Sequence, residues 1–215
     1  MRKILAVLTA IILVSAIPAM SAERFVSFPT LGVCTGSSVR YRGEPNTRGE
    51  IWGRLELDEK VIVEGRKIVN GEVWYEISPK DAQDSAYVFG KYLVPYFDED
   101  TQSSPAGKMI IDVLKTYCPY RDHDYWGEYD GEYDYPEVRR KFDSQGWLVR
   151  VEAWNPSKDF GFGDIHIGDS EEKLTEILGD PDEDTGPERI YMAGSSASLT
   201  FRVEDGKITR MIYEE

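Results

Sequence analysis

The chain has very little of the side-chain chemistry that hydrolases commonly use. Its 215 residues include two histidines, His123 and His166, and two cysteines, Cys34 and Cys118. A zinc hydrolase needs about three protein ligands, and a thiol peptidase needs a cysteine beside a histidine base. Cys118 also lacks the Asp-Cys-Ser-Gly setting of the papain-like wall peptidases. We therefore expect no catalytic residue, no bound metal and no cofactor.

Basic residues are scarce as well. The chain holds 25 Lys and Arg against 39 Asp and Glu, which gives a formal charge of −14. A polyanion such as nucleic acid would be repelled by this field, so we expect no nucleic-acid partner. The acidic balance by itself indicates good solubility.

Long apolar runs are absent except for one at the start of the chain. Arg2 and Lys3 precede an uncharged apolar run over residues 4–19, and small residues follow up to Ala22. This order predicts a secretory signal peptide over residues 1–22 with cleavage near Ala22. The run is short for a membrane span, which takes roughly 20 residues, although an uncleaved anchor is the alternative. No cysteine follows the run, so a lipid anchor is not expected.

Removal of this leader changes both the charge and the redox setting of the chain. The mature protein keeps 23 basic against 39 acidic residues, a formal charge of −16. We expect it to be secreted or held in the periplasm or cell envelope, with no stable membrane span after cleavage. Outside the cytoplasm a cysteine pair is usually bridged, so Cys34 and Cys118 are predicted to form a disulfide. Their spacing alone leaves two free thiols open.

Residues 32–95 read as short strands separated by turns. Each run is rich in β-branched and aromatic residues, and Asn70-Gly71 is typical of a two-residue hairpin turn. The expected strands are 39–41, 51–55, 60–64, 73–77 and 86–89. Five strands in about 60 residues indicate a small barrel rather than an open sheet.

This region resembles the bacterial SH3 (SH3b) domain. The matching segments, in the order of that family, are 38–47 (SVRYRGEPNT), 51–55 (IWGRL), 60–63 (KVIV), 74–77 (WYEI) and 87–93 (YVFGKYL). The chain departs from the family by one extra residue in the first loop, by a polar insertion from Ser78 to Ser85, and by Ala86 where a glycine is usual. The resemblance implies an SH3-like barrel that binds a cell-wall peptide or a protein.

The rest of the chain is predicted to be a linker, 96–105, and an α+β domain, 106–215. Ser104-Pro105 is typical of a helix start, and the apolar spacing from Met109 to Tyr117 predicts a helix that ends before Pro119. A short helix over 136–144 and a strand over 147–154 are expected to follow.

The last 50 residues predict a helix followed by an antiparallel β-meander. Asp169 and Glu172 form a capping box, and Gly179-Asp180-Pro181 ends the helix. Strands are expected at 189–192, 198–203 and 207–213. The segment 165–213 is similar to the module of the outer-membrane assembly lipoprotein (SmpA/OmlA) and β-lactamase-inhibitor-protein-like superfamily, which implies a structural or protein-binding role. The fold class is therefore α+β: a small SH3-like barrel, then an α+β domain.

Candidate ligand contacts lie in two places. The resemblance to SH3-like barrels implies Tyr41 and Asn46, because such barrels bind peptides near the first loop. The acidic, tyrosine-rich tract 121–135 offers Trp126, Tyr129 and Tyr133, whose rings provide contact area at low entropic cost. These rings could equally pack beneath their own loop.

Two further readings of the aromatic residues bear on these candidates. Trp52, Trp74 and Tyr87 are expected in the barrel core. A calcium loop starting at Asp122 would need an oxygen ligand at its fifth position and an acid at its twelfth. Those positions hold Trp126 and Tyr133, so no EF-hand is predicted.

Together these features predict an exported, non-enzymatic binding protein of the bacterial cell envelope, whose partner is a peptidoglycan peptide or an envelope protein. One alternative is an inhibitor or immunity-type protein that blocks an envelope enzyme with its acidic aromatic tract. A cell-wall hydrolase is the third reading.

Overall fold

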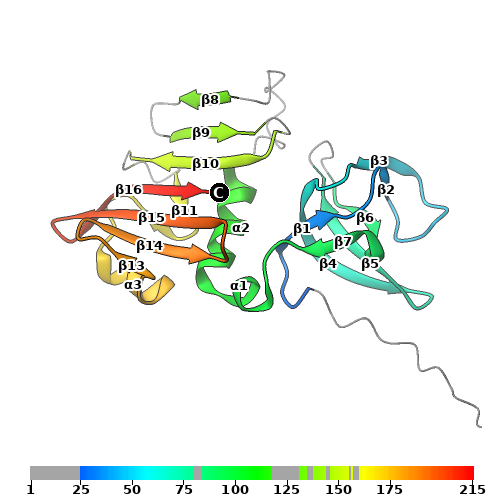
Figure 1. Ribbon diagram of the computed structural model, residues 1–215, viewed down its shortest axis with the longest axis horizontal. Coiled ribbons are helices and arrows are strands. Elements are labelled where there is room, and N and C mark those ends of the chain that lie inside the picture. Colours follow the sequence, from blue (N-terminus) through cyan, green and yellow to red (C-terminus); the bar gives the residue numbers. More distant parts are fainter. Residues whose placement is uncertain are drawn as a thin grey trace, which may run out of the picture.

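A computed structural model describes residues 25–79, 84–117, 131–134, 138–143, 146–154, 156 and 160–215. They form two seven-stranded antiparallel sheets with a helix layer between them (Figure 1). We call these the first sheet, β1–β7, and the second sheet, β8–β10 with β13–β16. No helix in the described ranges is long and apolar enough to cross a membrane.

The first sheet is open, and the predicted closed barrel is not formed. Its strands are β1 (Thr30–Cys34), β2 (Val39–Arg42), β3 (Ile51–Leu55), β4 (Lys60–Val69), β5 (Glu72–Ser78), β6 (Ala86–Phe89) and β7 (Leu93–Pro95). They pair in the order β3-β2-β6-β5-β4-β1-β7, so pairing ends at β3 and at β7. Leu55 of β3 and Leu93 of β7 nevertheless belong to one buried cluster. The sheet therefore curls around a common core without closing.

Local turn chemistry was predicted correctly. Asn70 and Gly71 adopt φ values of 52° and 80° between β4 and β5. Positive φ at both positions is the backbone of a type I′ hairpin, which asparagine and glycine adopt at low cost. Asp205 and Gly206 do the same between β15 and β16, with φ values of 52° and 72°.

The segment 96–105, expected to be a linker, is folded and partly buried. It contains helix α1 (Glu99–Ser103) and leads into α2 (Pro105–Tyr117) through Ser104, whose Oγ accepts a hydrogen bond from the Gly107 N–H at 2.9 Å. The predicted start of this helix is thus confirmed. Phe97 is only 4% exposed, so this connection is part of the core.

The second sheet has the order β13-β14-β15-β16-β10-β9-β8. The bounds of its strands are β8 (Gly131–Asp134), β9 (Val138–Phe142), β10 (Leu148–Ala153), β13 (Glu183–Asp184), β14 (Glu188–Ala193), β15 (Ala197–Glu204) and β16 (Lys207–Glu214). Smaller elements are the 3₁₀ turn η1 (Gly90–Tyr92), β11 (Gly161–Phe162), β12 (Ile165–His166) and α3 (Glu171–Leu178). The predicted C-terminal helix and meander are present as α3 and β14–β16.

The predicted helix over 136–144 is wrong, because residues 138–142 form strand β9. Val138 lies opposite Ala153, and Phe142 lies opposite Leu148, with both β9 side chains buried. Pairing with β10 therefore overrides the local helix signals at Pro136 and Gly146. The predicted capping residue of α3 is also displaced by one position. The side chain of Ser170, rather than Asp169, accepts the N–H of Lys173.

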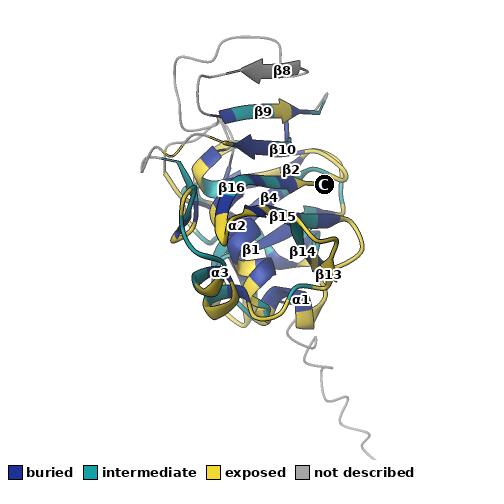
Figure 2. Ribbon diagram, turned by 90° about the vertical axis from the view of Figure 1, so that its left-hand side faces the viewer, coloured by how far each residue is buried: buried dark blue, intermediate teal, exposed yellow. Residues whose placement is uncertain are grey.

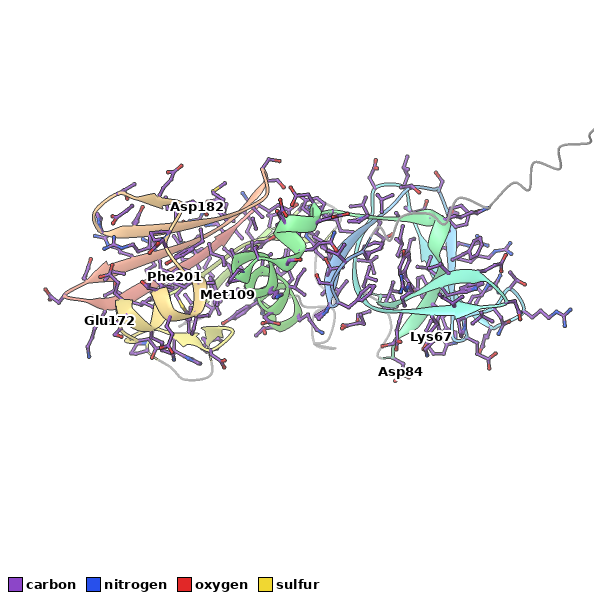
Figure 3. The ribbon with its side chains drawn as sticks, turned by 90° about the horizontal axis from the view of Figure 1, so that it is seen from below. Lys67, Asp84, Met109, Glu172, Asp182 and Phe201 are labelled. Atoms are coloured by element: carbon purple, nitrogen blue, oxygen red, sulfur yellow. The ribbon has the colours of Figure 1, made fainter. Side chains whose placement is uncertain are left out.

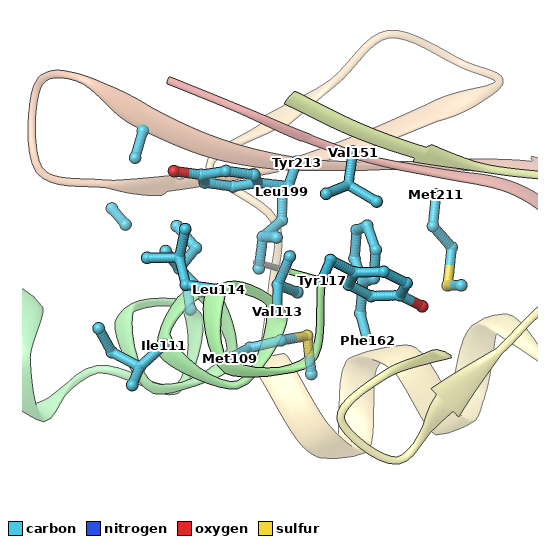
Figure 4. Close-up of a cluster of buried hydrophobic side chains, with 14 of the residues drawn as sticks. Met109, Ile111, Val113, Leu114, Tyr117, Val151, Phe162, Leu199, Met211 and Tyr213 are labelled. Carbon is cyan, nitrogen blue, oxygen red and sulfur yellow. The ribbon is translucent and has the colours of Figure 1, made fainter. Parts of the chain in front are cut away.

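Helices cover one face of the second sheet. Val113 and Leu114 of α2 point toward Leu199 and Tyr213 of the sheet (Figure 4). Seen from below, α2 and α3 lie on the same side of the strands (Figure 3). The other face of the sheet is free of helices in the described structure.

An apolar contact joins the two sheets. Leu31 of β1 lies directly opposite Ile62 of β4, and both belong to the cluster formed with α2 and Phe97. Their neighbour Val63 belongs to the other core, inside the first sheet. Because strand side chains alternate between faces, the β1–β4 pair is buried on both sides. In Figure 2 the buried residues accordingly run through α2 and β1.

Polar contacts surround this apolar joint. The backbone N–H of Val26 and the hydroxyl of Ser27 donate to Gln102 near the end of α1, at 3.1 and 2.8 Å. Lys115 of α2 pairs with Glu64 of β4 at 2.8 Å. These contacts restrain the joint at two further points.

The carboxylate of Glu215 is the centre of the third polar contact. It pairs with Lys60 of β4 and accepts hydrogen bonds from Tyr96 at 2.6 Å, Tyr213 at 3.1 Å and Trp147 at 3.2 Å. The ammonium of Lys60 also lies 5.0 Å from the centre of the Tyr96 ring. The two sheets are thus tied together by one shared carboxylate.

Replacement of either member of this ion pair should weaken folding. We expect Glu215→Gln to lower the free energy of unfolding by about 1–3 kcal/mol, because Lys60 would keep a partly buried charge without its counter-ion. Lys60→Met should lower the free energy of unfolding by less in the Glu215→Gln protein than in wild type, because the ion pair is already broken there. Urea unfolding of the four proteins checks this. Strictly additive losses would contradict the coupling.

Alkaline pH should destabilise the fold. Burial raises the pKa of Tyr96, Tyr117 and Tyr191 from 10.0 to about 12. Between these pH values the unfolded chain loses phenolic protons that the folded chain retains, so stability is complete below about pH 10 and declines toward pH 12. For Tyr117, which is 4% exposed, the decline is about 1.4 kcal/mol per pH unit. Urea titrations across this range should show a smaller slope for Tyr117→Phe than for wild type.

Candidate binding surfaces

Tyr41 is a core residue and does not stand on the expected binding surface. It lies on β2 rather than in the loop after it, and its side chain is 4% exposed. Alternation on the strand points Val39 and Tyr41 inward and Arg40 outward. The Tyr41 phenol covers the backbone of Gly53 on β3, where a Cβ would lie 2.1 Å from the hydroxyl oxygen. Its ring therefore fills the space that a glycine leaves.

Trp52 shows the opposite error. Trp74 and Tyr87 are buried, but neither belongs to the core cluster of the first sheet, and Trp52 is 42% exposed on β3. Its ring lies close to Gly43, where a Cβ would come within 2.6 Å of Cζ2, and its Nε1 is 3.4 Å from a carboxylate oxygen of Glu50. Trp52 is thus an ordered, exposed indole. Its exposure was missed because Gly53, the next residue on β3, faces the core, so that Trp52 points to the opposite side.

Asn46 is half-buried and shapes its own loop. Its Oδ1 accepts the backbone N–H groups of Arg48 and Gly49 at 2.8 and 2.7 Å, and its Nδ2 donates to Glu44 at 2.9 Å. The guanidinium of Arg42 donates to the Gly49 carbonyl at 2.6 Å. All of the polar atoms of the Asn46 side chain are engaged in holding the loop, so its role here is structural.

The other predicted contacts fall largely outside the described residues. Trp126, Tyr129 and Cys118 lie there, and Tyr133 is placed only by its backbone in β8, opposite Arg140 of β9. Their roles as ligand contacts stay predictions.

Cys34 is a free, buried cysteine at the end of β1. Its thiol donates to the Gly36 carbonyl at 3.2 Å, and burial raises its pKa. A raised pKa disfavours the thiolate, which is the nucleophilic form. The predicted bridge to Cys118 stays a prediction, since that partner is not described.

The helix-free side of the second sheet carries three rows of side chains, which we call the open face. One row, strand by strand from β14 to β9, is Ile190, Thr200, Ile212, Glu152 and Arg139; the next is Met192, Ser198, Glu214, Arg150 and Lys141; the third is Glu188, Arg202 and Arg210. The face thus has a small group of uncharged side chains (Ile190, Met192, Ser198, Thr200 and Ile212) between a charged row on β14–β16 and a charged part over β10 and β9.

Glu152 organises the charged part. Its side chain is 4% exposed and pairs with Arg210, while its second oxygen lies 3.6 Å from Nη2 of Arg150. Arg150 also donates to Glu214 at 2.7 Å. The buried Nε of Arg210 has no hydrogen-bond partner in the described ranges. Glu152 therefore holds two guanidinium groups in fixed positions while their outer edges face solvent.

Exposed apolar side chains flank these arginines. Trp154 follows β10 and is 38% exposed, with the guanidinium of Arg139 5.8 Å from its ring centre. Met192 on β14 is 41% exposed. Exposed aromatic, methionine and arginine side chains are the types enriched in protein interfaces.

The sign of the charge on the open face contrasts with the rest of this region. Residues 98–215 carry 13 Lys and Arg against 28 Asp and Glu. The open face has five basic residues against three acidic ones. Basic groups are therefore concentrated on the one side of this acidic region that the helices leave uncovered.

No set of described residues resembles a catalytic or metal centre. The described ranges contain no group of three or more His, Cys, Asp and Glu residues that could hold a metal ion. His166 lies beside Asp169, at 3.8 Å from Nδ1 to Oδ2, in the turn before α3. The arrangement suits recognition by charge and apolar contact. Comparison of the chain with known protein families, curated proteins and solved structures gave no match.

The packing of Tyr41 against Gly53 makes a clear prediction. Gly53→Ala should destabilise the protein by about 1–3 kcal/mol, because the new Cβ cannot coexist with the phenol in its present place. Gly65→Ala on β4 is the matched control, since its Cβ would meet only a Glu76 oxygen at 3.9 Å. Thermal unfolding of both variants tests this. Equal melting temperatures for the two would show that Tyr41 is not held as described.

Proposed function

We propose that this chain is an exported, non-enzymatic binding protein of the bacterial cell envelope, and that the open face is its main contact with a protein partner. The observation that carries the proposal is the concentration of fixed arginines and exposed apolar side chains on the helix-free side of an acidic region. A catalytic role has no comparable support among the described side chains.

The charge pattern favours a partner with an acidic surface. Opposite charges steer association and raise the rate of encounter, whereas the acidic remainder of the chain repels the same partner in wrong orientations. Guanidinium groups bind carboxylates with two parallel hydrogen bonds. The two Nη groups of Arg202, which pairs with Glu204 only through Nε, and the exposed part of Arg210 are available for such contacts, whereas Arg150 already pairs with Glu152 and Glu214.

Export in this proposal rests on the signal-peptide pattern of residues 1–22. Phe25 is 2% exposed and belongs to the core of the first sheet. Cleavage near Ala22 would therefore remove the leader and leave every described core residue in place. In this proposal the protein works in the periplasm or outside the cell.

The finer fold assignments also belong to this proposal. The order of short strands and hairpins in β2–β6 supports an SH3b-like first unit, in a curled rather than closed form. The run from α3 through β14–β16 supports kinship with the SmpA/OmlA and β-lactamase-inhibitor-protein-like module. Both assignments suit a binding protein.

Affinity capture with a variant of the open face tests the proposal. The mature chain from Glu23 is immobilised beside a triple variant, Lys141→Glu/Arg202→Glu/Met192→Asp, in which only exposed side chains of the face are changed. We expect one envelope protein to be retained by wild type and reduced about tenfold or more by the triple variant, because charge and apolar contact are both lost.

Lys108→Glu is the matched control. Lys108 is an exposed residue of α2, on the helix-covered side of the second sheet, so this variant should retain the partner. Capture that is the same on all three proteins would refute the role of the open face. Sedimentation with purified peptidoglycan is the second arm. If wild type and the triple variant bind the sacculus equally well, the cell wall is favoured as the partner instead. If the captured protein is an enzyme and loses its activity in the complex, the inhibitor reading gains support.

A further inference from the structure

The first sheet ends in an exposed apolar edge strand. Strand β3 is the outermost strand in the order, and among the described strands it pairs only with β2. Ile51 and Trp52 on this strand are 44% and 42% exposed. An edge strand offers unpaired N–H and C=O groups to any extended chain beside it, and proteins usually protect such edges. This edge is short, but its apolar side chains leave it open to pairing.

The surroundings of Trp52 are already ordered. Its ring rests on Gly43, and the loop from Gly43 to Glu50 is closed by a backbone hydrogen bond between these residues at 3.1 Å. Asn46 and Arg42 hold the same loop from inside through the contacts described above. A preformed surface loses little conformational entropy when a ligand binds, so more of the contact energy is available for affinity.

Exposed guanidinium groups lie around this edge. Arg40 and Arg48 are exposed, and in the described structure neither guanidinium has a polar partner; Arg54 donates only to the Ser38 carbonyl at 3.1 Å. The nearby carboxylates keep their charge but already accept hydrogen bonds: Glu44 from Asn46, Glu56 from Ser38, and Glu50 from the Trp52 indole N–H at 3.4 Å. The three guanidinium groups are thus the donors of this surface that still have hydrogen-bonding capacity for a ligand.

We propose that β3 accepts an extended, acidic segment of a partner protein as an additional strand of the first sheet. Backbone hydrogen bonds to the free edge of β3 would supply the pairing, which is the mode called β-augmentation. Trp52 would pack on an apolar side chain of the segment, and Arg40, Arg48 and Arg54 would meet its carboxylates. This docking edge is separate from the open face and does not depend on the function proposed for that face.

Titration with designed peptides tests the docking edge. The probe is a short synthetic peptide of alternating glutamate and valine, followed by calorimetry and by hydrogen exchange of the β3 amides. We expect the peptide to bind, to protect β3 amides from exchange, and to bind more weakly as salt is raised, because the pairing charges are exposed. The same peptide N-methylated on alternate amides should not bind, since it cannot pair as a strand.

Variants locate the contact. Trp52→Ala should weaken binding about tenfold or more, as loss of a central aromatic anchor does, and Arg40→Glu/Arg48→Glu should abolish the preference over a lysine–valine peptide. Trp154→Ala, a similarly exposed tryptophan on the second sheet, is the matched control and should bind as wild type does. Circular dichroism confirms that each variant is folded.

Three results would overturn the proposal. They are no binding of the acidic peptide, equal binding by Trp52→Ala, and equal binding of the N-methylated peptide. Binding of soluble peptidoglycan fragments in place of the acidic peptide would assign this edge to the wall and likewise reject a polypeptide partner. Because the triple variant of the open face keeps β3 intact, it should bind the peptide normally, so either proposal can fail alone.

Discussion

Burial of the Leu31–Ile62 pair against α2 is the contact on which the arrangement of the whole chain depends. A strand pair covered on one side would leave the first sheet as a separate body on a tether. Coverage on both sides makes β1 and β4 part of two cores at once. The ion pairs at Glu64 and Glu215 then fix the angle at which the sheets meet. Burial of apolar area stabilises the contact between the sheets, and the ion pairs and hydrogen bonds around it determine its geometry.

The joint between the sheets would matter to a protein that used both of the proposed surfaces. The edge of β3 and the open face lie on different sheets, and the contacts at the joint restrain how one sheet turns against the other. A partner that touches both surfaces meets them at one fixed separation, which avoids the entropic cost of ordering a flexible linker. Two contacts on one rigid body can then act as a single extended surface.

Local features of this fold could be predicted from the sequence, whereas features that depend on distant pairing could not. The Asn70-Gly71 turn was predicted because two adjacent residues decide the backbone. Residues 138–142 look helical in isolation, but the partner that makes them a strand is β10. Tyr41 and Trp52 were exchanged between core and surface because a slip of one residue reverses every side chain of a strand. The open face was missed because its arginines come from four strands spread over residues 139–210, where only strand alternation could have linked them.

The position of α2 in the chain also sets an order of events. Synthesis runs from the N-terminus, so all of β1–β7 exists before Pro105–Tyr117 emerges, and Leu31 and Ile62 remain uncovered during that interval. Lys60 stays without its counter-ion for longer still, because Glu215 follows it by 155 residues. The first sheet is therefore synthesised with one apolar side that α2 does not yet cover.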